Sequence, residues 1–87
     1  MTVVVGRAVR LGLDNRWIYL EAEAWEALDA IARREGRTVD DLCAAIERTR
    51  PRSVALGGSI RLFLSAYHAA DARSMSDGAP TAPRWLH

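Results

Sequence analysis

The sequence contains no lysine, only one cysteine and only two histidines, and these shortages exclude several classes of protein. A single cysteine cannot form an internal disulfide, and together with two histidines it offers no zinc-binding spacing such as CxxC or HExxH. No run of about 18 apolar residues is present, so we expect no membrane span. The chain should therefore contain neither a disulfide framework nor a metal centre.

Motifs for catalysis are also absent. The chain has no phosphate-binding loop and no GxSxG nucleophile turn. Asp40 and Asp41 are adjacent, but the start of a helix explains them better than acid–base chemistry. Cys43 falls on the apolar face of a predicted helix, which favours a buried structural thiol over a nucleophile. We therefore expect no enzyme and no cofactor.

The charge of the chain is nearly balanced. All twelve basic residues are arginine, which a genome rich in G and C explains, and the formal net charge is +1. Such a balance argues against strong electrostatic attraction of the whole chain to nucleic acid. The first twenty residues are locally basic, because Arg7, Arg10 and Arg16 face only Asp14; a solvated edge strand is the simplest interpretation. The N-terminus lacks the apolar region of a signal peptide, so we expect a cytoplasmic protein of bacterial type.

The segment from Asn15 to Gly36 organises the chain, since it predicts a short strand that leads directly into an amphipathic helix. Strand alternation over Arg16 to Leu20 places Ile18 and Leu20 toward a core. Trp17 and Tyr19 then point away from it. The strand needs a partner, and either residues 3–11 of the same chain, as a hairpin, or the strand of a second copy can supply it.

Three helices are predicted after this strand, at about residues 22–35, 39–48 and 56–72. Gly36 suits the left-handed position that ends the first helix, and Thr38 with Asp41 forms a capping-box pattern at the second. We expect one domain over residues 1–73, with a strand or hairpin at 3–20. Residues 74–87 read as a weakly ordered tail, in which Trp85 is either incidental or part of a docking segment.

A small basic cluster, formed by Arg48, Arg50 and Arg52, follows the second helix. The simplest interpretation is a solvated helix end and loop. The alternative is a contact with phosphate or with another acidic partner.

The order strand, helix, GRTV, helix resembles the ribbon-helix-helix family, with a fold of the Arc/MetJ type and an added third helix. The similarity covers about residues 7–70 and rests on an ordered set of residues rather than on one motif. These are Leu20-Glu21, Trp25-Glu26-Ala27-Leu28, Ile31-Ala32, Glu35-Gly36-Arg37, Leu42, Ile46 and Ile60-Arg61-Leu62-Phe63-Leu64.

The resemblance implies a mainly α fold with a short β-ribbon, assembled as an intertwined homodimer. It also implies a DNA-binding transcription regulator whose ribbon enters the major groove. Base edges would be read from the outer strand face, and the start of the second helix would meet phosphate. The DNA-binding residues are expected to be Arg7, Arg10, Asn15, Arg16, Trp17, Tyr19, Thr38 and Val39.

The strand departs from the family pattern at Trp17 and Tyr19, where small polar and basic residues are typical of DNA-binding members. This difference supports a second hypothesis, in which the same scaffold binds a protein partner through the exposed Trp17 and Tyr19 face without binding DNA. Aromatic residues with arginine are typical of the energetically dominant positions in protein interfaces. A third possibility is that another strand or the tail covers the two aromatic side chains.

Overall fold

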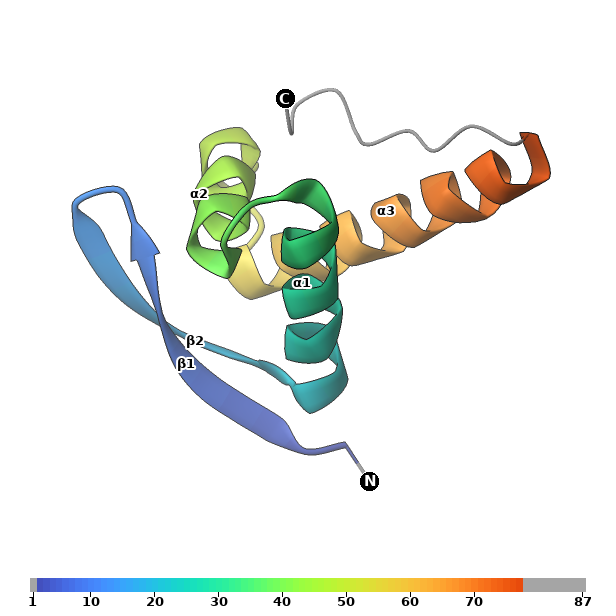
Figure 1. Ribbon diagram of the computed structural model, residues 1–87. Coiled ribbons are helices and arrows are strands. Elements are labelled where there is room, and N and C mark those ends of the chain that lie inside the picture. The colour runs from blue at the N-terminus through green and yellow to red at the C-terminus, as the bar shows by residue number, and fades with distance from the viewer. Residues whose placement is uncertain (1, 78–87) are drawn as a thin grey trace.

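The computed structural model describes the backbone of residues 2–77 and the side chains up to residue 72. It contains a two-stranded antiparallel hairpin followed by three helices, and all three helices lie on one face of the hairpin (Figure 1). The predicted fold class, mainly α with a short β-ribbon, is therefore confirmed. The expected Trp85 segment lies outside the described residues.

The hairpin pairs β1 (Val4–Leu11) with β2 (Asp14–Glu21). The register is continuous from Leu11 opposite Asp14 to Val4 opposite Glu21, so Gly6 marks no bulge. Gly12 has a φ of 67° and is the first of two turn residues, as in the type II′ turns that suit the twist of a hairpin. The sequence allowed β2 to pair either with residues 3–11 of the same chain or with a second copy. In the structure it pairs with β1 of the same chain.

The first two helices end and begin as their sequence signals predict. The first helix, α1 (Ala22–Glu35), closes at Gly36, whose left-handed backbone turns the chain so that the Arg37 N–H donates to the Ala32 carbonyl at 2.8 Å. The second helix, α2 (Val39–Thr49), begins with a complete capping box. The Asp41 N–H donates to the Thr38 hydroxyl at 3.0 Å, and the Thr38 N–H donates to the Asp41 carboxylate at 3.2 Å.

The third helix, α3 (Leu56–Asp77), continues beyond residue 72, where its apolar pattern fades, and so includes the start of the expected tail. Within residues 2–77, no helix is both long enough and apolar enough to cross a membrane.

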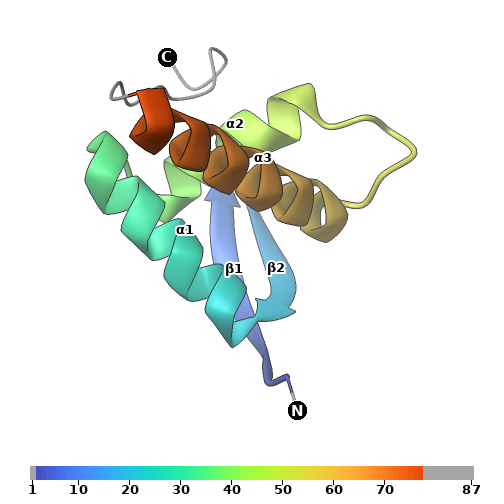
Figure 2. The ribbon, with the colours of Figure 1, turned by 90° about the vertical axis from the view of Figure 1, so that its right-hand side faces the viewer.

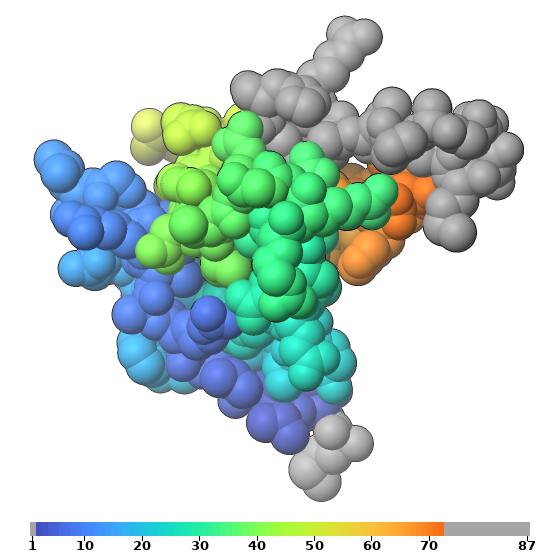
Figure 3. Space-filling model, in the orientation of Figure 1, coloured from blue at the N-terminus to red at the C-terminus, as the bar shows by residue number. Residues whose placement is uncertain are grey.

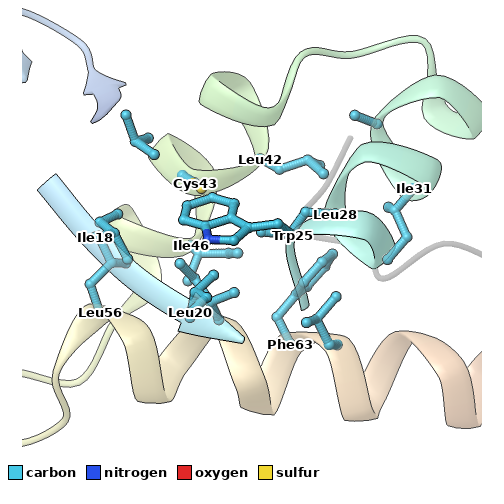
Figure 4. Packing of buried hydrophobic residues seen from close by; sticks show 14 of the residues in the cluster. Ile18, Leu20, Trp25, Leu28, Ile31, Leu42, Cys43, Ile46, Leu56 and Phe63 are labelled. Carbon is cyan, nitrogen blue, oxygen red and sulfur yellow. The ribbon is translucent and has the colours of Figure 1, made fainter. Parts of the chain in front are cut away.

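The core lies between the hairpin and the helices, and Trp25 occupies its centre (Figure 4). The indole of Trp25 is 3% exposed and donates a 2.8 Å hydrogen bond to the Val5 carbonyl. The Arg7 guanidinium lies 4.7 Å from the centre of the same ring, on the side of β1. Cys43 is fully buried, and burial raises the pKa of its thiol to about 12, as expected of a structural thiol.

Two polar contacts hold α2 across the helix side of the hairpin. At its start, Asp40 accepts a 3.2 Å hydrogen bond from the Arg10 backbone N–H on β1. Toward its end, Glu47 pairs with Arg16 of β2 at 3.1 Å. The space-filling view shows the start of α2 lying directly against the hairpin (Figure 3). The helix therefore fixes the orientation of the hairpin, and with it the direction of the outer face.

Candidate nucleic-acid interface

The outer face of the hairpin, the side away from the helices, combines four of the predicted site residues. Alternation along the strands brings Arg10 opposite Asn15, with Trp17 and Tyr19 following on β2. Trp17 and Tyr19 are 59% and 63% exposed, although both are large aromatic residues. The possibility that part of the described chain covers the two rings is therefore wrong. We call Arg10, Asn15, Trp17 and Tyr19 the outer-face group.

The two rings of this group form an ordered platform on the strands. Trp17 and Tyr19 meet edge to face, with 6.2 Å between ring centres. The indole of Trp17 leans across β1, so that a Cβ added at Gly6 would lie only 2.4–2.8 Å from three of its atoms. Glycine at position 6 therefore makes room for the ring. The two rings therefore lie along the strands and expose their faces and edges to solvent.

The predicted residues Arg7 and Arg16 lie on the opposite, helix-facing side of the hairpin. Arg7 pairs with Asp29 of α1 at 3.5 Å, and Arg16 pairs with Glu47 of α2 at 3.1 Å. Their side chains are still 42% and 44% exposed. Both arginines thus stabilise the attachment of the hairpin to the helices, and the structure does not place them beside the outer-face group.

At the start of α2, Thr38 and Val39 lie next to two carboxylates. The capping box occupies the Thr38 hydroxyl and lowers the pKa of Asp41, chiefly through hydrogen bonds from the Thr38 backbone and side chain. Val39 is half-buried against the core. Asp40 and Asp41 keep negative charge where the family pattern places DNA phosphate, and this charge opposes the attraction of the helix N-terminus for an anion.

The basic cluster lies at the other end of α2. Arg50 donates hydrogen bonds from its Nε and Nη2 atoms to the Glu47 carboxylate. It donates a further hydrogen bond, 2.7 Å long, to the Val54 carbonyl. The Arg50 guanidinium lowers the pKa of Glu47. Arg48 and Arg52 are exposed, and neither makes an ion pair with the described part of the chain. The end of α2 therefore carries two exposed arginines without ion pairs to the described residues, whereas Arg37 lies beside the two carboxylates at its start.

One edge of the hairpin is open. In an antiparallel pair closed by a two-residue turn, alternate residues direct their N–H and C=O groups away from the partner strand, and on β2 these are Asn15, Trp17 and Tyr19. Within residues 2–77 no side chain and no third strand bonds to these groups. A shallow hollow of about 460 Å³ runs along this edge, between residues 16–19, Arg50 and residues 55–57.

Sequence reasoning missed two features of this region. The contact between Gly6 and Trp17 joins positions that are diagonal across the ladder, so it requires the register of the hairpin, although a glycine inside a strand is a general sign of close approach. The position of Arg50 beside β2 depends on the tertiary packing of α2, and no local pattern reports it.

Comparison with known proteins identifies the family. A family model described as a ribbon-helix-helix domain matches residues 4–68, which is most of the chain. The chain therefore belongs to the ribbon-helix-helix family, whose members are commonly DNA-binding transcription regulators. Neither a search of curated proteins nor a search of solved structures finds a match.

Proposed function

We propose that the protein is a homodimeric DNA-binding transcription regulator of the bacterial cytoplasm that directs the outer face of its β-ribbon into the major groove. The observation that carries this proposal is the outer-face group, which is exposed on a ribbon of this family with the start of α2 beside it. A two-stranded ribbon fits the major groove of B-DNA, which is about 12 Å wide.

The outer-face group offers complementary contacts to base edges. Arg10 suits the paired acceptors of guanine, and Asn15 suits the acceptor and donor of adenine. Trp17 and Tyr19 present apolar surface for thymine methyl groups and sugars, and each ring also carries one polar group. Because Arg10 is the only cation in the group, much of the remaining attraction must come from outside it.

Phosphate contacts come from the flanks of the ribbon in this proposal. Arg7 and Arg16 reach backbone phosphates with the exposed parts of their side chains rather than reading bases. At the start of α2, Val39 contributes its backbone N–H and Thr38 orders this turn through its capping box, against the opposing charge of Asp40.

The open edge of β2 supplies the dimer contact. Two copies of β2, paired antiparallel across a two-fold axis, would satisfy the N–H and C=O groups that the hairpin leaves unbonded at Trp17 and Tyr19. The resulting ribbon has β2 and its counterpart in the middle and one β1 on each side. The bulky side chains belong to the central strands, and Gly6 leaves room on β1 for the Trp17 ring.

The test is DNA binding measured by fluorescence anisotropy, on labelled fragments from upstream of the protein's own gene. We expect submicromolar binding at low salt that weakens steeply as salt rises, because phosphate contacts release counterions. Arg10→Ala and Asn15→Ala should each weaken binding to the preferred fragment by about 1–3 kcal/mol.

Arg34→Ala is the matched control, since it also removes one positive charge. Arg34 pairs with Asp71 at 2.7 Å, on the side of α1 and α3 away from the outer face. Its replacement should leave binding nearly unchanged. Equal losses for Arg10→Ala and Arg34→Ala would instead indicate attraction to overall charge, and no binding at low salt would reject the proposal.

A second candidate function is binding of a protein partner through the outer face, without DNA. The ordered pair of Trp17 and Tyr19 favours it, because exposed aromatic rings with one neighbouring arginine are typical of protein-binding surfaces. Trp17→Ala discriminates between the two functions. Loss of a partner that copurifies with the wild type, in a protein that shifts no DNA, would support the second candidate.

A further inference from the structure

The outward face of α3 lacks the charge expected of a helix surface in water. After Arg61, which pairs with Glu21 at 2.8 Å, no exposed side chain carries a formal charge until Asp71. A solvent-facing helix usually carries charged and polar residues on that side. In Figure 2, α3 lies in front, and no other helix or strand lies over its near side. The exposed residues of this stretch are Leu62, Ser65, Ala66, His68 and Ala69.

A hollow of about 250 Å³ opens beside this face, between α3 and the end of α2. Its wall includes Ile46, Pro51 and Phe63, so it is mainly apolar. Leu62 stands at the same hollow with 63% of its surface exposed. An apolar cavity of about 150 Å³ is enough to bind benzene, so this hollow can take a leucine side chain.

An unbonded hydroxyl group also lies in this hollow. Ser59 lines it and is only 8% exposed, yet its Oγ has no hydrogen-bond partner among the described residues. Buried polar atoms are nearly always bonded in folded proteins, because an unpaired one costs about 1–3 kcal/mol. Because this Oγ has almost no accessible surface, the apolar wall and Leu62, rather than the hydroxyl, are the groups that a neighbouring chain would contact.

We infer that a second copy of this chain covers this face, with α3 packed against its counterpart across a two-fold axis and Leu62 inserted beside the hollow of the other copy. A protruding side chain and the hollow that accepts it lie on the same surface, which is the requirement for a self-complementary two-fold contact. Ser59 and Ala66, three residues before and four after Leu62, are small and lie on the same side of the helix. They would permit a close approach of the two helices, near 8 Å between axes.

The outward face of α3 is continuous with the open edge of β2. The inference therefore rests on the strand-paired dimer of the proposed function. Arg50 lines both hollows, the one along β2 and the one beside α3. A copy seated on the strand edge would thus lie next to the α3 face. In this arrangement the dimer has two contacts: the pairing of the β2 strands and an apolar contact between the two α3 helices.

The experiment compares Leu62→Asp with Leu13→Asp by sedimentation over a range of concentrations. Leu13 is 99% exposed at the hairpin turn, so the two variants make the same chemical change at two exposed leucines. Circular dichroism should show both variants folded, because neither leucine contributes much to the core. We expect Leu62→Asp to weaken dimerisation by about tenfold or more and Leu13→Asp to leave it unchanged.

A second pair of variants separates this inference from the strand pairing. Tyr19→Pro removes the N–H from the open edge of β2, whereas Tyr19→Ser removes only the ring. If Tyr19→Pro dissociates the dimer and Leu62→Asp does not, the α3 contact is overturned while the strand-paired dimer stands. A wild-type protein that stays monomeric at all concentrations would overturn both.

A cross-linking measurement gives independent support. Leu62 itself lines the hollow that the other copy's Leu62 approaches, so the two side chains at position 62 lie close together and Leu62→Cys should form a disulfide-linked dimer under mild oxidation. Cys43 is fully buried and should not compete. Leu13→Cys is the control, and cross-linking at an equal rate in both variants would contradict the inference.

Discussion

Replacing the two aromatic residues of the outer face, as Trp17→Ser with Tyr19→Arg, should cost little stability and increase DNA binding. The two changes restore the small polar and basic residue types of DNA-binding family members. One arginine is added per chain, and therefore two per dimer, on the surface proposed to meet the groove. Non-specific affinity should rise and its dependence on salt should become steeper.

The cost in stability follows from the exposure of the two rings. With 59% of Trp17 exposed, about 100 Å² of a side chain that can bury about 250 Å² is covered. At about 25 cal/mol per Å² this corresponds to at most about 2.5 kcal/mol, and Tyr19 contributes somewhat less. The two bounds sum to about 4 kcal/mol, but the unfolded chain already buries part of this surface and the new arginine retains part of the contacts. We therefore expect a combined loss of about 2 kcal/mol in the free energy of unfolding.

Urea unfolding followed by circular dichroism measures this loss, with Trp25→Ala as the reference for a buried ring. Trp25 is 3% exposed, and its truncation should cost about 3–5 kcal/mol. If the double variant loses as much as Trp25→Ala, the outer face is covered in solution, and the reasoning is refuted.

Three further predictions concern the fold. Ile18→Asp buries an unpaired charge at a residue that is 5% exposed, and it should abolish cooperative unfolding in circular dichroism. Thr38→Ala removes the hydroxyl that caps α2 and should cost about 1 kcal/mol in urea unfolding. Burial and the Glu35 carboxylate raise the pKa of Tyr67 to about 12, so the protonated phenol stabilises the fold below pH 10. That contribution, about 2–3 kcal/mol, should be lost as the pH rises from 10 to 12, and Tyr67→Phe should abolish this part of the pH dependence.

The helices and the strand faces follow from local rules that the sequence displays. Gly36 ends α1 and the Thr38 capping box begins α2 because these signals act within one helical turn. The alternation that buries Ile18 and exposes Trp17 has period two in any sheet. The partner of β2 could not be predicted in the same way, since a hairpin and a strand-paired dimer produce the same alternation.

The candidate site could be predicted only in part, for a related reason. Arg10 and Asn15 share the outer face through the hairpin register, which requires the strand pairing to be known. Arg7 and Arg16 have ion-pair partners on α1 and α2, and these depend on how the helices pack across the hairpin. The basic start of the sequence therefore divides into Arg10, which lies exposed on the outer face, and two arginines that are ion-paired on the helix-facing side.

The measurement that tests the central proposal most directly is a salt titration of DNA binding by the wild type and Arg10→Ala. The proposal predicts that the wild type prefers one upstream fragment over an unrelated duplex of equal length, and that Arg10→Ala reduces this preference while the protein stays folded and dimeric. Equal affinity for both duplexes, unchanged by Arg10→Ala, would contradict reading of DNA by the outer face.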